Sequence, residues 1–223
     1  MKTQSKSALY LIGSAVWMST VLAQSSVDTR KMLIPMAANA KQMMRYEWKQ
    51  RITVIRKGQP SEPVINQVRF DSNGQMQRTT ISAPEQNQMH GLRGRVAAGV
   101  KEDVKQIMEL AGSYNKPQQM VDAIKKAQIS AAPGGTIRVQ SNGLIKPTDS
   151  MTMLANPTTH LAKHIDINTD YDGDPMTIAQ DYSPVPGGPN VMKSMKVSVP
   201  GKNLVVKVDS YDFVQQSAGR AIR

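Results

Sequence analysis

The sequence predicts an α+β domain in which helices pack on one face of an antiparallel sheet. Residues 134–215 contain six short runs of β-prone residues separated by turn sequences, and a helical pattern covers residues 100–129 just before them. Blocks of strands and helices in this order are typical of the class, because a sheet with one apolar face buries that face against helices. A helix at 35–44 and strands over 44–82 come first, so the sheet has about nine strands, the last six over 136–213.

The run 161–171 shows the strand pattern most clearly. Ile165, Ile167 and Tyr171 occupy one face, whereas the polar residues between them occupy the other. A period of two indicates a strand with one buried and one solvated face. Asp172-Gly173 then predicts a two-residue type I′ hairpin turn, because both residue types tolerate positive φ.

The first strands also present an apolar face. Apolar and polar residues alternate from residue 44 to 54, a second strand ends at Phe70, and the more polar strand 76–82 is interpreted as an edge. The residues that we expect to line a cavity come from these strands and from the following helices: Tyr46, Trp48, Ile52, Val54, Val68, Phe70, Met108 and Met120.

The helices are predicted from spacing. Met36, Ala40, Met43 and Met44 recur on one face of a helix that Pro35 begins, since proline suits a first turn. Two amphipathic helices follow within residues 100–129. Residues 83–99 are interpreted as a basic loop, mobile and functional or simply a surface connection.

Residues 1–23 have the features of an export signal. A basic start with Lys2 and Lys6 precedes an apolar core, and Val21 and Ala23 fit the small-residue rule for cleavage after Ala23. The apolar run is shorter than the roughly 20 residues of a membrane-spanning helix. An uncut membrane anchor is the alternative. We expect one domain, residues 24–223, in the periplasm of a Gram-negative-type bacterium.

Composition narrows the classes of partner. The chain has no cysteine, which excludes disulfides and thiolate chemistry. It has 28 Lys and Arg against 17 Asp and Glu, and removal of Lys2 and Lys6 leaves a net charge of +9. For an exported protein, this charge favours peripheral contact with anionic lipid head groups or with cell-surface polymers over nucleic acid. A basic surface without a dedicated partner is the alternative.

Motifs for chemistry are absent or incomplete. His160 and His164 are four residues apart, which on a strand separates them by about 13 Å, too far for one metal ion. The acidic run 166–174 fits a hairpin better than an EF-hand, because the twelfth position from Asn168 is Ala179 rather than Glu. We predict no catalytic residue, no metal and no cofactor. An enzyme would require His90 or carboxylates such as Asp166 and Asp181 to converge in a cleft.

Several segments resemble a family of exported bacterial proteins with no assigned function. They are RYEWKQR at 45–51, QVRFD at 67–71, GLRGR at 91–95 and YDGDP at 171–175. The order of elements is also similar to the periplasmic lipoprotein-carrier (LolA-like) fold. That resemblance implies a strongly curved, incomplete barrel with helices on its concave face and a cavity for acyl chains.

Two hypotheses for function follow. In the first, the half-barrel binds or carries a lipid, an acylated molecule or a lipoprotein, and the basic residues Arg93, Arg95 and Lys101 meet anionic head groups at the rim. In the second, the core is filled and the protein is a structural or interaction partner in the cell envelope. The 15 methionines suit either an adaptable apolar cavity or ordinary core packing. The oligomeric state does not follow from the sequence.

Overall fold

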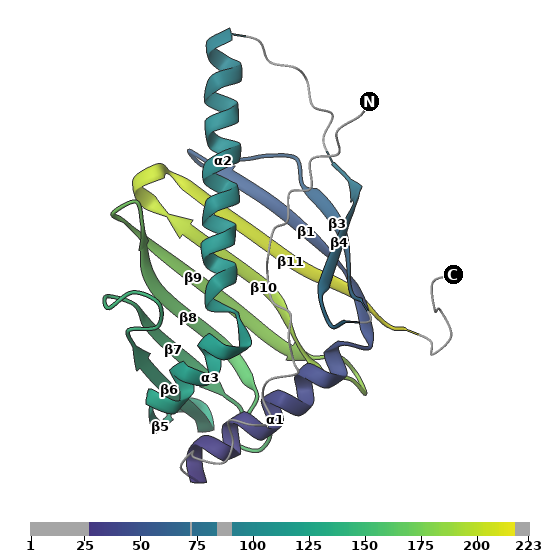
Figure 1. Cartoon of the computed structure of the whole chain (residues 1–223), viewed down its shortest axis with the longest axis vertical. Coiled ribbons are helices and arrows are strands. Elements are labelled where there is room, and N and C mark those ends of the chain that lie inside the picture. The colour runs from purple at the N-terminus through teal and green to yellow at the C-terminus, as the bar shows by residue number, and fades with distance from the viewer. Residues whose placement is uncertain (1–26, 72, 84–90, 217–223) are drawn as a thin grey trace.

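One large antiparallel sheet dominates the structure, and three helices lie across one of its faces (Figure 1). This computed structural model describes residues 27–71, 73–83 and 91–216, with side chains described from residue 29 and, in the second helix, from residue 99. The helices are α1 (Val27–Met43), α2 (Gly91–Tyr114) and α3 (Pro117–Lys126). The predicted α+β class is confirmed.

The sheet has eleven strands in the order β4-β3-β1-β11-β10-β9-β8-β7-β6-β5, and the short β2 pairs with β1 outside this path. It is not closed, because β4 and β5 each have one neighbour, so it forms an open half-barrel. Its strands are β1 (Tyr46–Arg56), β2 (Gln59–Pro60), β3 (Val64–Phe70), β4 (Met76–Ser82), β5 (Gln128–Ala132), β6 (Thr136–Asn142), β7 (Ser150–Ala155), β8 (Ala162–Tyr171), β9 (Asp174–Pro184), β10 (Asn190–Val199) and β11 (Leu204–Gln215).

The six C-terminal strands form the predicted meander, and β4 is the predicted edge. In β8, Ile165, Ile167 and Tyr171 are buried while Asp166 is exposed, as their alternation predicts. The β8–β9 turn is also confirmed: Asp172 and Gly173 have φ of 52° and 81°, and Tyr171 pairs with Asp174 across a two-residue loop. A positive φ at both central residues defines the type I′ class.

Two strands were not predicted. β2 consists of two residues inside the expected loop 58–63, and β5 occupies part of the segment assigned to the second helix of 100–129. All but the last residue of β5 are exposed, so no apolar pattern marks it. Gly134 and Gly135 both have positive φ and reverse the chain, which allows β5 to pair with β6.

Two predicted helix boundaries were wrong. α1 begins before residue 35 and continues through Pro35, since the buried Met32 and Leu33 extend its apolar face towards the N-terminus. α2 begins at Gly91, so the backbone of residues 91–99 is helical rather than a loop. Its glycines were interpreted as breaks, but helix propensity is a weak signal that the surrounding alanine, arginine and leucine outweigh. Residues 1–23, the predicted export signal, lie outside the described residues.

The core lies between the helices and the C-terminal strands. Ile107 and Tyr114 of α2 and Ile124 of α3 are fully buried there. They pack with the inward residues of β7 to β11, which include Met151, Met153, Ile167, Met176, Ile178, Val197 and Val206. This packing fixes the helices over the sheet and leaves the region around β1, β3 and β4 less completely filled.

The β8–β9 turn yields a stability prediction. We expect Gly173→Ala to lower the free energy of unfolding by about 1–2 kcal/mol, because an L-residue with a Cβ is strained in the left-handed region. No atom lies within 4 Å of the Cβ position, so the cost is conformational rather than a clash. Urea denaturation measures the change.

Gly99→Ala is the matched control. Gly99 also has no atom within 4 Å of its Cβ position, but it lies inside α2. There alanine should raise stability by about 0.5–1 kcal/mol. Equal effects of the two substitutions would contradict the assigned conformation of the turn.

Candidate functional site

A cavity of about 250 Å³ lies between α1, the start of α3 and the inner face of the sheet. α1 contributes Met36, Ala40 and Met43, Met44 follows it directly, and the helix pair contributes Met108, Pro117 and Met120. Eight methionines line it in all: Met36, Met43, Met44, Met76, Met108, Met120, Met192 and Met195. The wall is therefore predominantly apolar and rich in flexible side chains.

The structure brings together five of the eight residues expected in a cavity wall: Trp48, Ile52, Phe70, Met108 and Met120. The other three lie elsewhere on the same side of the sheet. Val68 is fully buried, Val54 is half-buried against the core, and the Tyr46 hydroxyl lies against Gly188 in the β9–β10 turn. A role of these residues in binding remains a prediction.

Three aromatic rings form one side of the cavity. The Trp48 ring centroid lies 5.8 Å from that of Phe70 in a tilted arrangement and 5.9 Å from that of Phe213 in a stacked one. These rings come from β1, β3 and β11, and the pairing of β1 with both neighbours places them in a row. Phe213 was not predicted, because its contact with Trp48 joins the two ends of the chain.

Several polar side chains in the wall already have hydrogen-bond partners within the protein. Asn39 exchanges two hydrogen bonds with the backbone of Asn190, at 2.8 and 2.7 Å. Gln180 donates to Asn115 at 2.9 Å and accepts from the Tyr182 hydroxyl at 3.1 Å. Burial raises the pKa of Tyr182, so its hydroxyl stays protonated. These pairs leave few polar groups free to recognise a ligand.

Arg78 of β4 is the exception. It lines the cavity, its Nε is buried without a hydrogen-bond partner, and no carboxylate within the described residues forms an ion pair with it. Burial lowers the pKa of its guanidinium from the ordinary value. The sequence pattern could not identify this residue. β4 has no clear apolar face, so its sequence does not show which of its residues point inward.

Of the three residues predicted to form a basic rim, the structure describes the side chain of Lys101 alone. Lys101 is exposed on α2 and does not line the cavity, whereas the side chains of Arg93 and Arg95 lie outside the description. Residues 91–99 form a helix, so the expectation of a basic loop over 83–99 was wrong for this part of it.

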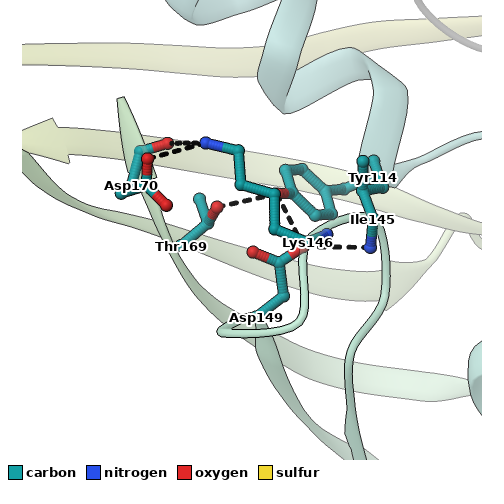
Figure 2. Close-up of polar contacts among 6 residues, drawn as sticks. All are labelled: Tyr114, Ile145, Lys146, Asp149, Thr169 and Asp170. Carbon is teal, nitrogen blue, oxygen red and sulfur yellow. Dashed lines mark hydrogen bonds and ion pairs between the residues drawn. The ribbon is translucent and has the colours of Figure 1, made fainter. Parts of the chain in front are cut away.

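A buried polar cluster fastens the C-terminal end of α2 to the sheet (Figure 2). The Tyr114 hydroxyl donates to Asp149 Oδ2 at 2.9 Å and lies 2.7 Å from the Thr169 hydroxyl. The same carboxylate oxygen accepts the backbone N–H groups of Ile145 and Lys146, at 2.9 and 2.6 Å. Lys146 Nζ in turn contacts Asp170 at 2.8 Å. The helix, the β6–β7 loop and β8 are thereby joined.

The cluster is structural rather than poised for proton transfer. Burial raises the pKa of Tyr114 well above its ordinary value, so the phenol is a permanent donor. Burial also opposes ionisation of Asp149, but hydrogen bonds from Lys146, Thr169, Ile145 and Tyr114 outweigh it and hold the pKa below its ordinary value. The carboxylate therefore stabilises the fold above its unfolded pKa, and this contribution is lost as the pH falls through the folded pKa.

A second ionisable cluster is partly exposed to solvent, on the polar side of β8. His164 Nδ1 lies 2.7 Å from Asp181 Oδ1, and its Nε2 lies 2.9 Å from Asp166 Oδ2. Asp181 also accepts a hydrogen bond from Ser194 at 2.9 Å. Both imidazole nitrogens are occupied by carboxylates, and no group of metal-binding residues was found within the described residues. His90 lies outside them.

The chain is similar in overall arrangement to several solved structures, as its order of elements predicts. A DUF1329 family protein from Desulfovibrio piger is 9% identical, with a TM-score of 0.43, covering 86% of this chain and 92% of that one. An outer membrane lipoprotein-sorting protein domain, described as putative, from Vibrio parahaemolyticus is 7% identical, with a TM-score of 0.44 and coverages of 85% and 94%. A LolA superfamily protein from Nitrosomonas europaea is 6% identical, with a TM-score of 0.41 and coverages of 83% and 94%.

These similarities concern the LolA-like arrangement of strands and helices alone. No protein-family model matches the sequence, and a search of curated proteins finds no relative. Among the described residues, no helix is both long and apolar enough to span a membrane. Any account of function must therefore come from the chain's own residues.

The cluster in Figure 2 yields a second stability prediction. Tyr114→Phe should lower the free energy of unfolding by about 1–3 kcal/mol, because Asp149 and Thr169 lose a buried partner. Tyr211→Phe is the control, since the Tyr211 hydroxyl forms no hydrogen bond within the described residues while its ring lies under Arg51. Equal stability of both variants in urea would contradict the assigned role.

The His164 cluster yields a pH prediction. Burial disfavours the imidazolium, but the hydrogen bonds that it donates to Asp181 and Asp166 outweigh this effect and raise the pKa of His164 above its ordinary value. The imidazolium therefore stabilises the fold fully below the unfolded pKa, and the stabilisation is lost as the pH rises through the folded pKa. His164→Gln should lose most stability, relative to wild type, at about pH 5.5 and least at about pH 9.

Chemical denaturation across that pH range measures how much stability His164→Gln loses at each pH. In a variant that carries Asp166→Asn and Asp181→Asn, the loss caused by His164→Gln should no longer depend on pH, because the carboxylates that raise the pKa of His164 are gone. If His164→Gln loses the same stability at every pH when both aspartates are present, the imidazolium is not the source of the stabilisation.

Proposed function

We propose that the protein binds a single apolar chain of a lipid or acylated molecule in the cavity beneath α1. The observation that carries this proposal is the cavity itself, about 250 Å³ of space lined by methionines and three aromatic rings. Ligand pockets occupy roughly 300–1,000 Å³, so this volume suits one chain rather than several.

The chemistry of the wall supports an apolar ligand without fixed shape. Methionine side chains are unbranched and flexible, so they adapt to a chain that has many conformers. Asn39, Asn115 and Tyr182 of the wall already have hydrogen-bond partners within the protein, so they offer few contacts to a rigid polar ligand. The affinity then comes mainly from burial of methylene groups, about 0.8 kcal/mol for each.

The cavity favours this proposal over the second hypothesis, in which a filled core serves a structural or interaction role. The net positive charge suits transient contact with anionic membrane surfaces, from which such a ligand would be taken. Export through the sequence at residues 1–23 would bring the protein to the cell envelope, where lipids are its natural cargo.

Native mass spectrometry of the protein purified from a periplasmic extract tests the proposal. We expect lipid to copurify at close to one molecule per chain, and solvent extraction then identifies it. Protein that carries no lipid, and that takes up none after incubation with envelope lipids, would contradict the proposal.

A variant pair assigns the binding to the cavity. Ala40→Trp should fill the space beneath α1 and largely remove the bound lipid, because Ala40 lines the cavity. Ala38→Trp introduces the same side chain at an exposed position of the same helix and should retain the lipid. Retention by both variants would place the ligand elsewhere.

A further inference from the structure

Arg78 is a charged residue on the inner face of the sheet. It pairs with Val68 of β3, and Val68 pairs with Trp48 of β1. Side chains directly opposite each other in neighbouring strands share one face. Arg78, Val68 and Trp48 therefore form a row across the sheet, and Arg78 and Trp48 both line the cavity.

The guanidinium of Arg78 has unused hydrogen-bonding capacity. An arginine side chain has five N–H donors. Within the described residues, the one side-chain hydrogen bond of Arg78 runs from Nη2 to Met76 Sδ at 3.6 Å, and sulfur is a weak acceptor. Nε is buried with no partner. Arg78 as a whole is half-buried, so the unsatisfied group is the buried Nε, and a buried donor without an acceptor is unfavourable.

The neighbouring polar groups do not supply one. Asn115 and Tyr182, on another part of the wall, both hydrogen-bond to the buried Gln180. No ion pair joins Arg78 to any aspartate or glutamate of the described residues. Within the described residues, these donors of Arg78 therefore have no strong acceptor.

We propose that Arg78 binds the oxyanion head group of the amphiphile whose chain fills the cavity. This inference rests on the proposed function and specifies its ligand class: a compact carboxylate or phosphate monoester at the end of an apolar chain. A guanidinium recognises both oxyanions through two parallel hydrogen bonds. The head group lies at the β4 edge of the sheet, and the chain extends along Phe70 and Trp48 towards α1.

Binding of matched ligands by isothermal titration calorimetry tests the inference. Dodecanoate, dodecyl phosphate and dodecanol share one chain and differ in the head group. At pH 7.5, where a carboxylate is ionised, we expect the two anions to bind at least about tenfold more tightly than dodecanol, equivalent to about 1.4 kcal/mol. Inorganic phosphate, which lacks the chain, should not bind measurably.

Three variants assign the preference to Arg78. Arg78→Met keeps an apolar stem without the charge, so it should lose the preference for the two anions over dodecanol. Arg78→Lys should retain part of it. Arg69→Met is the matched control, because Arg69 is exposed on β3 next to Val68 and should retain all of it.

The outcomes separate the two proposals. If none of the three dodecyl ligands binds, both the proposed function and this inference are overturned. Equal binding of dodecanol and dodecanoate by the wild type, or an anion preference that survives in Arg78→Met, would overturn this inference alone. If inorganic phosphate binds as tightly as dodecyl phosphate, the anion site does not depend on the alkyl chain of the ligand, and this inference is overturned.

Discussion

The pairing of β1 with β11 is the contact on which the rest of the structure depends. Ten residue pairs, from Tyr46 with Gln215 to Arg56 with Leu204, join the first strand of the chain to the last. In the strand order, this is the junction between β4-β3-β1 and the C-terminal meander. It also places Trp48 against Phe213, so the aromatic side of the cavity exists only after the two chain ends have met.

The parts of the fold that the sequence predicted are those set by local patterns. The alternation in β8 and the Asp172-Gly173 turn depend on near neighbours, and the structure agrees with both. The methionines of α1 likewise recur at helical spacing and do share one face, which lines the cavity. Five of the eight predicted wall residues could be named because their strands and helices have a clear apolar face.

The parts that were missed depend on partners distant in the sequence. β5 has no apolar pattern and is a strand only because β6 supplies its hydrogen bonds. α1 passes through Pro35 because buried contacts of Met32 and Leu33 stabilise its first turns. Arg78 faces inward because Val68 and Trp48 fix the orientation of β4, which its own residues do not reveal.

The methionine lining makes the cavity sensitive to oxidants. Oxidants convert the thioether of methionine into a polar, chiral sulfoxide, and dedicated reductases reverse the change. Five of the lining methionines are only half-buried and are the thioethers that a soluble oxidant reaches first: Met36, Met43, Met44, Met76 and Met192. Oxidation there would turn an apolar wall polar without changing the fold of the sheet. The capacity of the cavity for an apolar chain would then depend on the redox state of its surroundings.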